Sequence, residues 1–133
     1  MLQVSNPIEV ALRNARQKRR DGLADEAELL YAEAAELARS KGDRAALAHA
    51  LRHVSDLARV RGASSKAWNE ASEAVALYRQ IGDQLGLANA VRLQALSTPH
   101  PNQAQAFWKE ARDLYSDLGV NAGVAECDAR LKA

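Results

Sequence analysis

Two histidines and an aspartate have the spacing that a metal site on a helix would need. His49 and His53 are four residues apart and Asp56 follows three residues later, so a helix would place all three on one face. This spacing can hold a zinc ion. Ala50 stands, however, where the helical metalloprotease motif His-Glu-x-x-His requires its glutamate. We therefore interpret the histidines as polar residues lining a groove and expect neither a metal nor a cofactor.

The sequence lacks the short motifs of common enzyme classes. It contains no glycine-rich phosphate loop, no Gly-x-Ser-x-Gly nucleophile elbow and no paired cysteines. Its one cysteine is Cys127. The sequence contains an internal repeat, described below, in which Ala50 and Ala90 occupy the positions equivalent to Cys127. Because both are small residues, we predict a packed thiol rather than a nucleophile. We therefore expect a protein that is not an enzyme.

Arginines are the residues best suited to bind a ligand. The run from Arg16 to Arg20 is basic at four of its five positions, and Arg13, Arg52 and Arg92 lie in similar helical segments. An arginine fork suits a carboxylate. Aromatic residues make up 5% of the chain, which is too few for a surface that stacks on nucleic-acid bases. These features favour an acidic protein or peptide partner over a nucleic acid.

Size and composition are those of one small globular domain. The chain has 133 residues, a net charge of +1 and 47% hydrophobic residues. No apolar run is long enough to span a membrane, and the first ten residues, MLQVSNPIEV, lack the basic and apolar regions of a signal peptide. We therefore expect a single domain over residues 1–133, located in the cytoplasm and without membrane contact.

Apolar residues recur along the whole chain at a period near 3.6, which predicts helices and no strands. We expect seven helices, at about residues 7–21, 23–41, 44–61, 65–81, 84–97, 103–118 and 121–132. Asn6, Asp43 and Asp83 suit helix N-caps, as does either Ser64 or Ser65. Two prolines separate the fifth and sixth segments and should keep the residues around them out of a helix.

One segment recurs three times along the chain. Residues 67–83 match residues 27–43 at an offset of 40 and residues 104–120 at an offset of 37. The shared positions include three alanines and three glycines: Ala34, Ala74, Ala111, Gly42, Gly82 and Gly119. We interpret each unit as a pair of antiparallel helices, at residues 7–42, 43–82 and 83–119, followed by a capping helix at 120–132. Stacked pairs can bury an apolar stripe that one pair alone could not.

The unit resembles a tetratricopeptide repeat, whose second helix carries the pattern Ala-x-x-x-Phe. Ala27 and Tyr31 match that pattern in the first unit, and Ala104 and Trp108 match it in the third. In the second unit the family's core positions fall on Leu51, Val54, Ser55, Ala58, Ala67, Ala71 and Ala74. The units are longer than the usual repeat of about 34 residues. The resemblance implies an all-α fold: a right-handed superhelical solenoid of three antiparallel helix hairpins plus a C-terminal capping helix.

The resemblance also implies that the first helix of each unit lines a concave groove. The groove positions fall on Glu9, Arg13, Arg16 and Arg20 in the first unit, on His49, Arg52, His53 and Asp56 in the second, and on Asn89 and Arg92 in the third. The three first helices carry a net charge of +7 and the three second helices a net charge of −4. We therefore expect a basic groove that binds an acidic or C-terminal peptide segment of a partner protein.

Two other functions fit the same sequence. The protein could associate with itself as a homodimer, through its groove or its last helix. It could instead be a small-ligand sensor fragment, related to the helical repeat domains of regulators. The last helix has a polar side, as expected of a terminal cap, formed by Glu126, Asp128, Arg130 and Lys132. A polar side of this kind disfavours further stacking.

Overall fold

The fold of residues 6–133 was obtained as a computed structural model. Seven α-helices occupy this range, which contains no strand, so the predicted all-α class is confirmed. The helices are α1 (Pro7–Arg20), α2 (Ala24–Lys41), α3 (Arg44–Val60), α4 (Ser64–Ile81), α5 (Gln84–Ser97), α6 (Pro101–Leu118) and α7 (Asn121–Lys132). Residues 1–5, part of the stretch in which we expect no signal peptide, lie outside the described residues.

Capping residues mark six of the helix ends. The side chains of Asn6, Asp43 and Asp83 each accept a hydrogen bond from a backbone N–H in the first turn of α1, α3 and α5, which confirms the three predicted N-caps. Helices α2, α4 and α6 each end at a glycine in the left-handed conformation, which other residues adopt at a cost. These glycines are Gly42, Gly82 and Gly119.

Two helix starts differ from the sequence prediction. Helix α6 begins at Pro101 rather than near residue 103, because proline fits the first helical position, where its missing N–H leaves no hydrogen bond unmade. Helix α4 begins at Ser64, with Ala63 as its N-cap and no side-chain hydrogen bond at that cap. The prediction that Ser64 or Ser65 caps this helix is therefore wrong.

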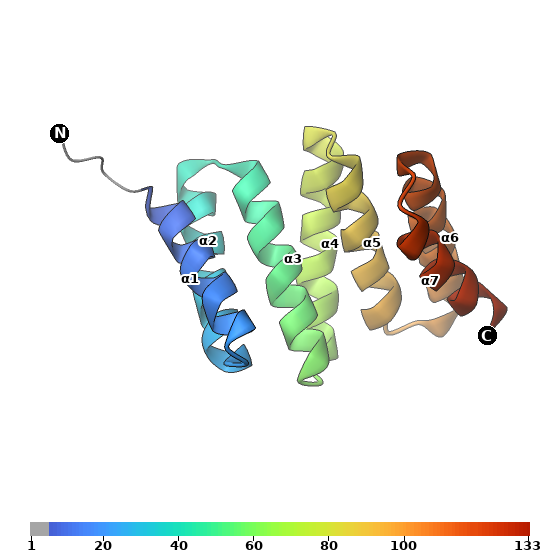
Figure 1. The fold of residues 1–133 in the computed structure, drawn as a ribbon, viewed down its shortest axis with the longest axis horizontal. Coiled ribbons are helices and arrows are strands. Elements are labelled where there is room, and N and C mark those ends of the chain that lie inside the picture. The colour runs from blue at the N-terminus through green and yellow to red at the C-terminus, as the bar shows by residue number, and fades with distance from the viewer. Residues whose placement is uncertain (1–5) are drawn as a thin grey trace.

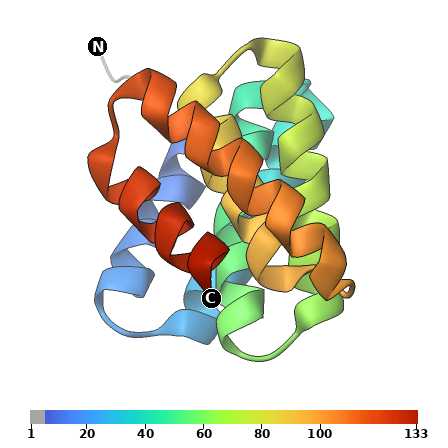
Figure 2. The ribbon, with the colours of Figure 1, turned by 90° about the vertical axis from the view of Figure 1, so that its right-hand side faces the viewer.

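The helices stand side by side in chain order along the longest axis of the molecule (Figure 1). Each helix packs against the next one in the chain, and α3 also contacts α5. Helix α1 lies in front of α2 and α7 in front of α6 in this view. Seen from the C-terminal end, α6 and α7 form the near end of the row (Figure 2). The α3–α5 contact thus joins two helices that are not consecutive in the chain.

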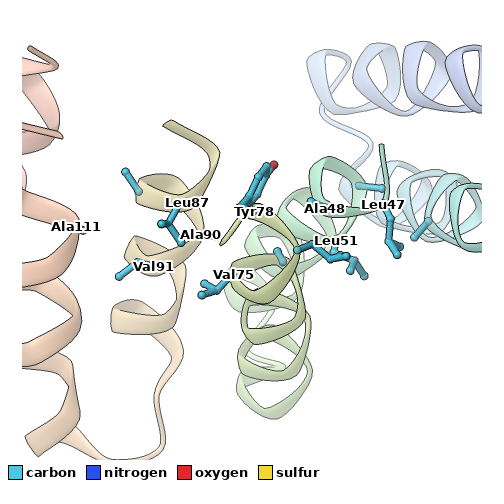
Figure 3. Close-up of a cluster of buried hydrophobic side chains, with 14 of the residues drawn as sticks. Leu47, Ala48, Leu51, Val75, Tyr78, Leu87, Ala90, Val91 and Ala111 are labelled. Atoms are coloured by element: carbon cyan, nitrogen blue, oxygen red, sulfur yellow. The ribbon is translucent and has the colours of Figure 1, made fainter. Parts of the chain in front are cut away.

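Small side chains allow the helices to pack closely. Ala34, Ala74 and Ala111 occupy the same position in the three units, and all three are fully buried. Between α3 and α4 the buried Ser55 hydroxyl donates to the Ala67 carbonyl oxygen at 2.7 Å, a contact that requires the two backbones to lie close together. Around these positions, larger apolar residues of α3, α4 and α5 fill the core beside Ala111 of α6 (Figure 3).

A tyrosine packed on a glycine joins the later units. A Cβ atom built at Gly86 would lie 2.2 Å from the Tyr78 ring, and one at Gly123 would lie 2.5 Å from the Tyr115 ring. The two pairs are related by the offset of 37. Because glycine leaves this space free, each of these two tyrosine rings lies against the backbone of the next odd-numbered helix. The hydroxyl groups are thereby carried toward the face formed by α3, α5 and α7.

Candidate functional site

Helices α1, α3 and α5 together enclose a hollow of about 250 Å³. Its lining residues are Arg19 of α1, Arg52, His53 and Asp56 of α3, and Asn89, Arg92 and Leu93 of α5. We call this site the arginine hollow. The spacing of three and four residues within α3 and α5 explains why one face of each helix supplies several of these side chains. Five of the ten groove residues predicted from the sequence line the hollow, and the exposed Glu9 of α1 is one of those that do not.

An ion-pair network closes one side of the arginine hollow. The carboxylate of Asp56 accepts from Arg19 Nη2 at 2.5 Å through one oxygen and from Arg59 Nη2 at 2.8 Å through the other. Burial alone would raise the pKa of Asp56, but the hydrogen bonds from Arg59 and Arg19 outweigh it and hold the pKa below its usual value. Asp56 is therefore an anion whose two oxygens are both occupied.

His53 is a neutral member of the same wall. Its Nδ1 lies 2.9 Å from Arg19 Nη1, and since a guanidinium only donates, Nδ1 must accept and the ring proton must sit on Nε2. The ring stacks on Tyr31 with centroids 4.5 Å apart, and His49 meets its edge. Burial, together with the nearby charge of Arg52, lowers the pKa of His53 to about 3. The pKa of His49 is lowered for the same reasons.

The two histidines have no partners for binding a metal. Within residues 6–133, no group of three or more histidine, cysteine or acidic side chains is placed to hold an ion. Asp56 follows the histidines along α3, but its oxygens are committed to Arg19 and Arg59. The helical spacing seen in the sequence therefore produces an aromatic and ionic wall, in which His53 packs between Tyr31 and His49.

Arg92 is neutralised by the last helix. Its Nε and Nη2 donate to the two carboxylate oxygens of Glu126 on α7, at 2.6 and 2.9 Å. These hydrogen bonds lower the pKa of Glu126 and raise that of Arg92, so both groups are charged at neutral pH. Two parallel bonds between a guanidinium and a carboxylate fix both position and orientation. Arg92 thus lines the arginine hollow with its charge already compensated.

Arg52 is the exception among the arginines of the hollow. Its Nε donates to the Tyr78 hydroxyl at a long 3.4 Å, and no carboxylate of the described residues lies within ion-pair distance of it. Beside it, Asn89 Oδ1 accepts from the Tyr115 hydroxyl at 2.6 Å. Burial raises the pKa of Tyr115 to about 12, which keeps this hydroxyl protonated as a donor.

The charges in and around the arginine hollow do not balance. Four guanidinium groups meet two carboxylates there: Arg19, Arg52, Arg59 and Arg92 against Asp56 and Glu126. His53 adds no charge at neutral pH. The Nε of Arg59 is in addition a buried donor to which the described part of the chain offers no acceptor. The site therefore carries a positive excess, which favours an anionic group within it.

The remaining predicted site residues lie outside the hollow. Arg13, Arg16 and Arg20 are exposed on α1, where the charges of Arg16 and Arg20 still oppose the rise that burial gives the pKa of Tyr31. His49 touches the hollow only through His53. The exposed arginines thus extend the basic surface along α1 without entering the hollow.

The residues of the site that were not predicted include Arg19, Tyr78, Tyr115 and Glu126. The recurrence of each tyrosine together with a glycine eight residues later was visible in the sequence, as Tyr78 with Gly86 and Tyr115 with Gly123. No comparable signal singles out Arg19 from its basic neighbours, because only the crossing of α1 and α3 decides which of them reaches Asp56.

The chain matches no model of a protein family and no curated protein sequence. None of the helices in residues 6–133 combines the length and hydrophobicity needed to cross a bilayer. The arginine hollow is therefore the feature of the molecule that indicates a function.

Proposed function

We propose that this protein is a non-enzymatic interaction module that binds an acidic or C-terminal peptide segment of a partner protein in the arginine hollow. The observation that carries the proposal is Arg52, a half-buried guanidinium with no carboxylate partner in a site whose other arginines are paired. A ligand carboxylate gains charge-assisted hydrogen bonds there. It also meets a local excess of positive charge, which speeds encounter with acidic segments.

The dimensions of the site support a peptide end or one acidic side chain as the bound group. A volume of about 250 Å³ is small for a whole peptide but ample for a carboxylate and the carbons that bear it. The exposed Arg13, Arg16 and Arg20 of α1 lie along the same helix that supplies Arg19 to the hollow. They would meet further acidic residues of the same segment, at the modest energies typical of exposed ion pairs.

We further propose that the helix row is a tetratricopeptide-like, right-handed solenoid made of three hairpins and the cap α7. Support comes from the repeated sequence and from contacts that recur at the same offsets. Arg39 pairs with Glu73 and Arg79 pairs with Glu110, each joining one even-numbered helix to the next. Repeated junctions of this kind characterise stacked helical units. A cytoplasmic location is part of the same proposal.

A fluorescence anisotropy titration tests the peptide-binding function. The probe is a labelled peptide of aspartate and glutamate residues with a free C-terminal carboxylate, and the Arg52→Glu protein is compared with Lys109→Glu. Lys109 is exposed on α6, so its reversal changes the net charge equally without touching the hollow. We expect saturable binding that weakens with salt, and that Arg52→Glu removes while Lys109→Glu preserves. Equal binding by both variants would refute the function.

A further inference from the structure

The arginines of the hollow occupy equivalent positions in successive units. Arg52 of α3 and Arg92 of α5 are related by the offset of 40, and Asn89 of α5 and Glu126 of α7 by the offset of 37. Arg52 and Asn89 therefore occupy, at the junction between α3 and α5, the positions that the ion-paired Arg92 and Glu126 occupy at the junction between α5 and α7. The two contacts differ in one respect: a carboxylate stands at position 126 and an amide at position 89.

The tyrosine–glycine contact recurs beside both junctions. Tyr78 and Tyr115 are related by the same offset of 37, and each packs on the glycine of the following helix. The Tyr78 hydroxyl lies beside Arg52, at 3.4 Å from its Nε. The Tyr115 hydroxyl reaches the hollow at Asn89. Each junction thus has a tyrosine hydroxyl close to it, and the junction at Arg92 has in addition the carboxylate of Glu126, which the junction at Arg52 lacks.

The junction between the first two units shows no such contact. Leu12 stands at the position equivalent to Arg52, and His49 at the position equivalent to Asn89. Burial lowers the pKa of His49, so this pair carries no charge at neutral pH. At these equivalent positions, one of the three junctions is uncharged and one is neutralised within the chain. The middle junction alone has an arginine without an acid, within the part of the chain that the structure describes.

We propose that the middle junction recognises a single carboxylate of the ligand, which takes at Arg52 the place that the Glu126 side chain takes at Arg92. This inference rests on the proposed peptide-binding function and names the group that is recognised. The Arg52 guanidinium provides the fork, as Arg92 does for Glu126 with bonds of 2.6 and 2.9 Å. Asn89 provides a neutral donor beside it.

The hydrogen bond from Tyr115 prepares Asn89 for this role. A protonated tyrosine hydroxyl donates to Asn89 Oδ1 at 2.6 Å, which occupies the acceptor end of the amide. The Nδ2 group, which only donates, has no hydrogen-bond partner among residues 6–133. Asn89 therefore has free N–H donors for a ligand, as an anionic oxygen requires. A glutamate at this position would repel the same ligand.

The decisive variant is Asn89→Glu, which gives Arg52 an internal carboxylate of the kind that Arg92 already has. We expect this protein to lose affinity for the acidic peptide by about tenfold or more, the scale set by hydrogen bonds to charged groups. Its melting temperature should stay level or rise, because Arg52 gains a partner. Asn69→Glu is the matched control, since Asn69 is exposed within α4 and away from the hollow.

The experiment is an isothermal titration of each protein with the acidic peptide and with a phosphoserine peptide of equal charge, with melting followed by circular dichroism. Loss of peptide binding in Asn89→Glu alone, without a fall in melting temperature, supports the inference. If Asn89→Glu melts early, Arg52→Gln replaces it and must show the same loss. Binding by the wild type with Asn89→Glu unchanged overturns the inference but leaves the peptide function standing. Binding of only the phosphoserine peptide also overturns it. No binding by the wild type refutes the function itself.

Discussion

At the residue scale, the neighbours of an arginine decide whether its charge is available to a ligand, as Arg19, Arg52 and Arg92 show. Arg19 forms an ion pair with Asp56, and Arg92 forms one with Glu126, through hydrogen bonds of 2.5 to 2.9 Å. Removing either acid would leave a partly buried charge alone, which costs more than the pair contributes. Arg52 has only the Tyr78 hydroxyl at 3.4 Å. Its charge is therefore available to a ligand at little structural cost.

At the residue scale, the buried histidine predicts how stability varies with pH. The pKa of His53 falls from 6.5 to about 3 on folding, so below pH 6.5 the unfolded chain binds a proton that the folded protein rejects. The free energy of unfolding should therefore decrease as pH falls from 6.5, by at most about 1.4 kcal/mol per pH unit for one proton. The lowered pKa of His49 adds an effect of the same sign.

Urea denaturation at pH 7, 6 and 5 measures this slope. These pH values lie above the ordinary range of carboxylates, so Asp56 and Glu126 stay ionised throughout. The His53→Gln variant should show a shallower slope than the wild type, because one of the two histidines no longer titrates in its unfolded chain. A stability that is constant from pH 7 to pH 5 in the wild type would contradict the neutral, buried state assigned to His53.

Part of this site could be predicted from the sequence, because helical spacing decides which residues share one face of a helix. Helical spacing alone places His49, Arg52, His53 and Asp56 on one face of α3, and the face survives in the structure. The sequence did not predict which arginines are neutralised, because each ion pair joins residues of different helices that lie 34 or 37 positions apart in the sequence. These ion pairs form only at particular distances and crossing angles between α1, α3, α5 and α7. Such distances and angles cannot be predicted from the pattern of one sequence.

At the element scale, the tyrosine–glycine contact sets how closely α4 and α5 approach. Gly86→Ala would place a methyl group 2.2 Å from the Tyr78 ring. Although alanine is the better helix former, overpacking should dominate and lower the free energy of unfolding by about 1–3 kcal/mol. Chemical denaturation measures the change. Ala46 holds the equivalent place opposite Ala38, so Ala46→Gly serves as the control and should cost only the helix propensity, about 1 kcal/mol.

A double variant separates this contact from other effects of the substitution. Combining Gly86→Ala with Tyr78→Ala recreates the alanine pair found between α2 and α3. The double variant should therefore be more stable than the sum of the two single changes predicts, with a coupling of at least about 0.5 kcal/mol. Strict additivity would show that the Tyr78 ring and position 86 do not constrain each other.

The last helix is tied to the hollow by a single ion pair. Glu126→Gln removes the carboxylate that holds Arg92, with side chains about one-third exposed in both residues. We expect a loss of about 1–2 kcal/mol in the free energy of unfolding, less than for a fully buried pair because water screens the charges. The same change releases Arg92 and should tighten binding of the acidic peptide. Weaker binding by Glu126→Gln in a titration would contradict the assigned role of this pair.

The helices themselves were largely predictable, because their ends are encoded locally. Aspartates and glycines at the boundaries mark where α3 and α5 begin and where α2, α4 and α6 end. The start of α6 was predicted too late, since proline was treated as a breaker although it fits the first turn. Ser64 and Ser65 suit a cap by type, but the backbone places Ala63 at that position.

For the whole molecule, the last helix predicts the state of association. On α7, Cys127 is buried and Val124 and Leu131 pack against the core, while the exposed residues include Ala125, Ala129, Arg130 and Lys132. An outer face of small and charged residues, without large apolar side chains, ends a row of helices and does not favour further stacking. We expect light scattering to give a mass near 14.4 kDa at all concentrations tested. A mass that doubles with concentration would favour the homodimer.

The most direct test of the peptide-binding account is a titration of the isotope-labelled protein with the acidic peptide, followed by amide chemical shifts in solution NMR. The account predicts that the largest shifts gather on α3 and α5 around Arg52, His53 and Asn89, with smaller ones along α1. Shifts confined to the outer helices α2, α4 and α6, or no shifts at a saturating peptide concentration, would contradict it.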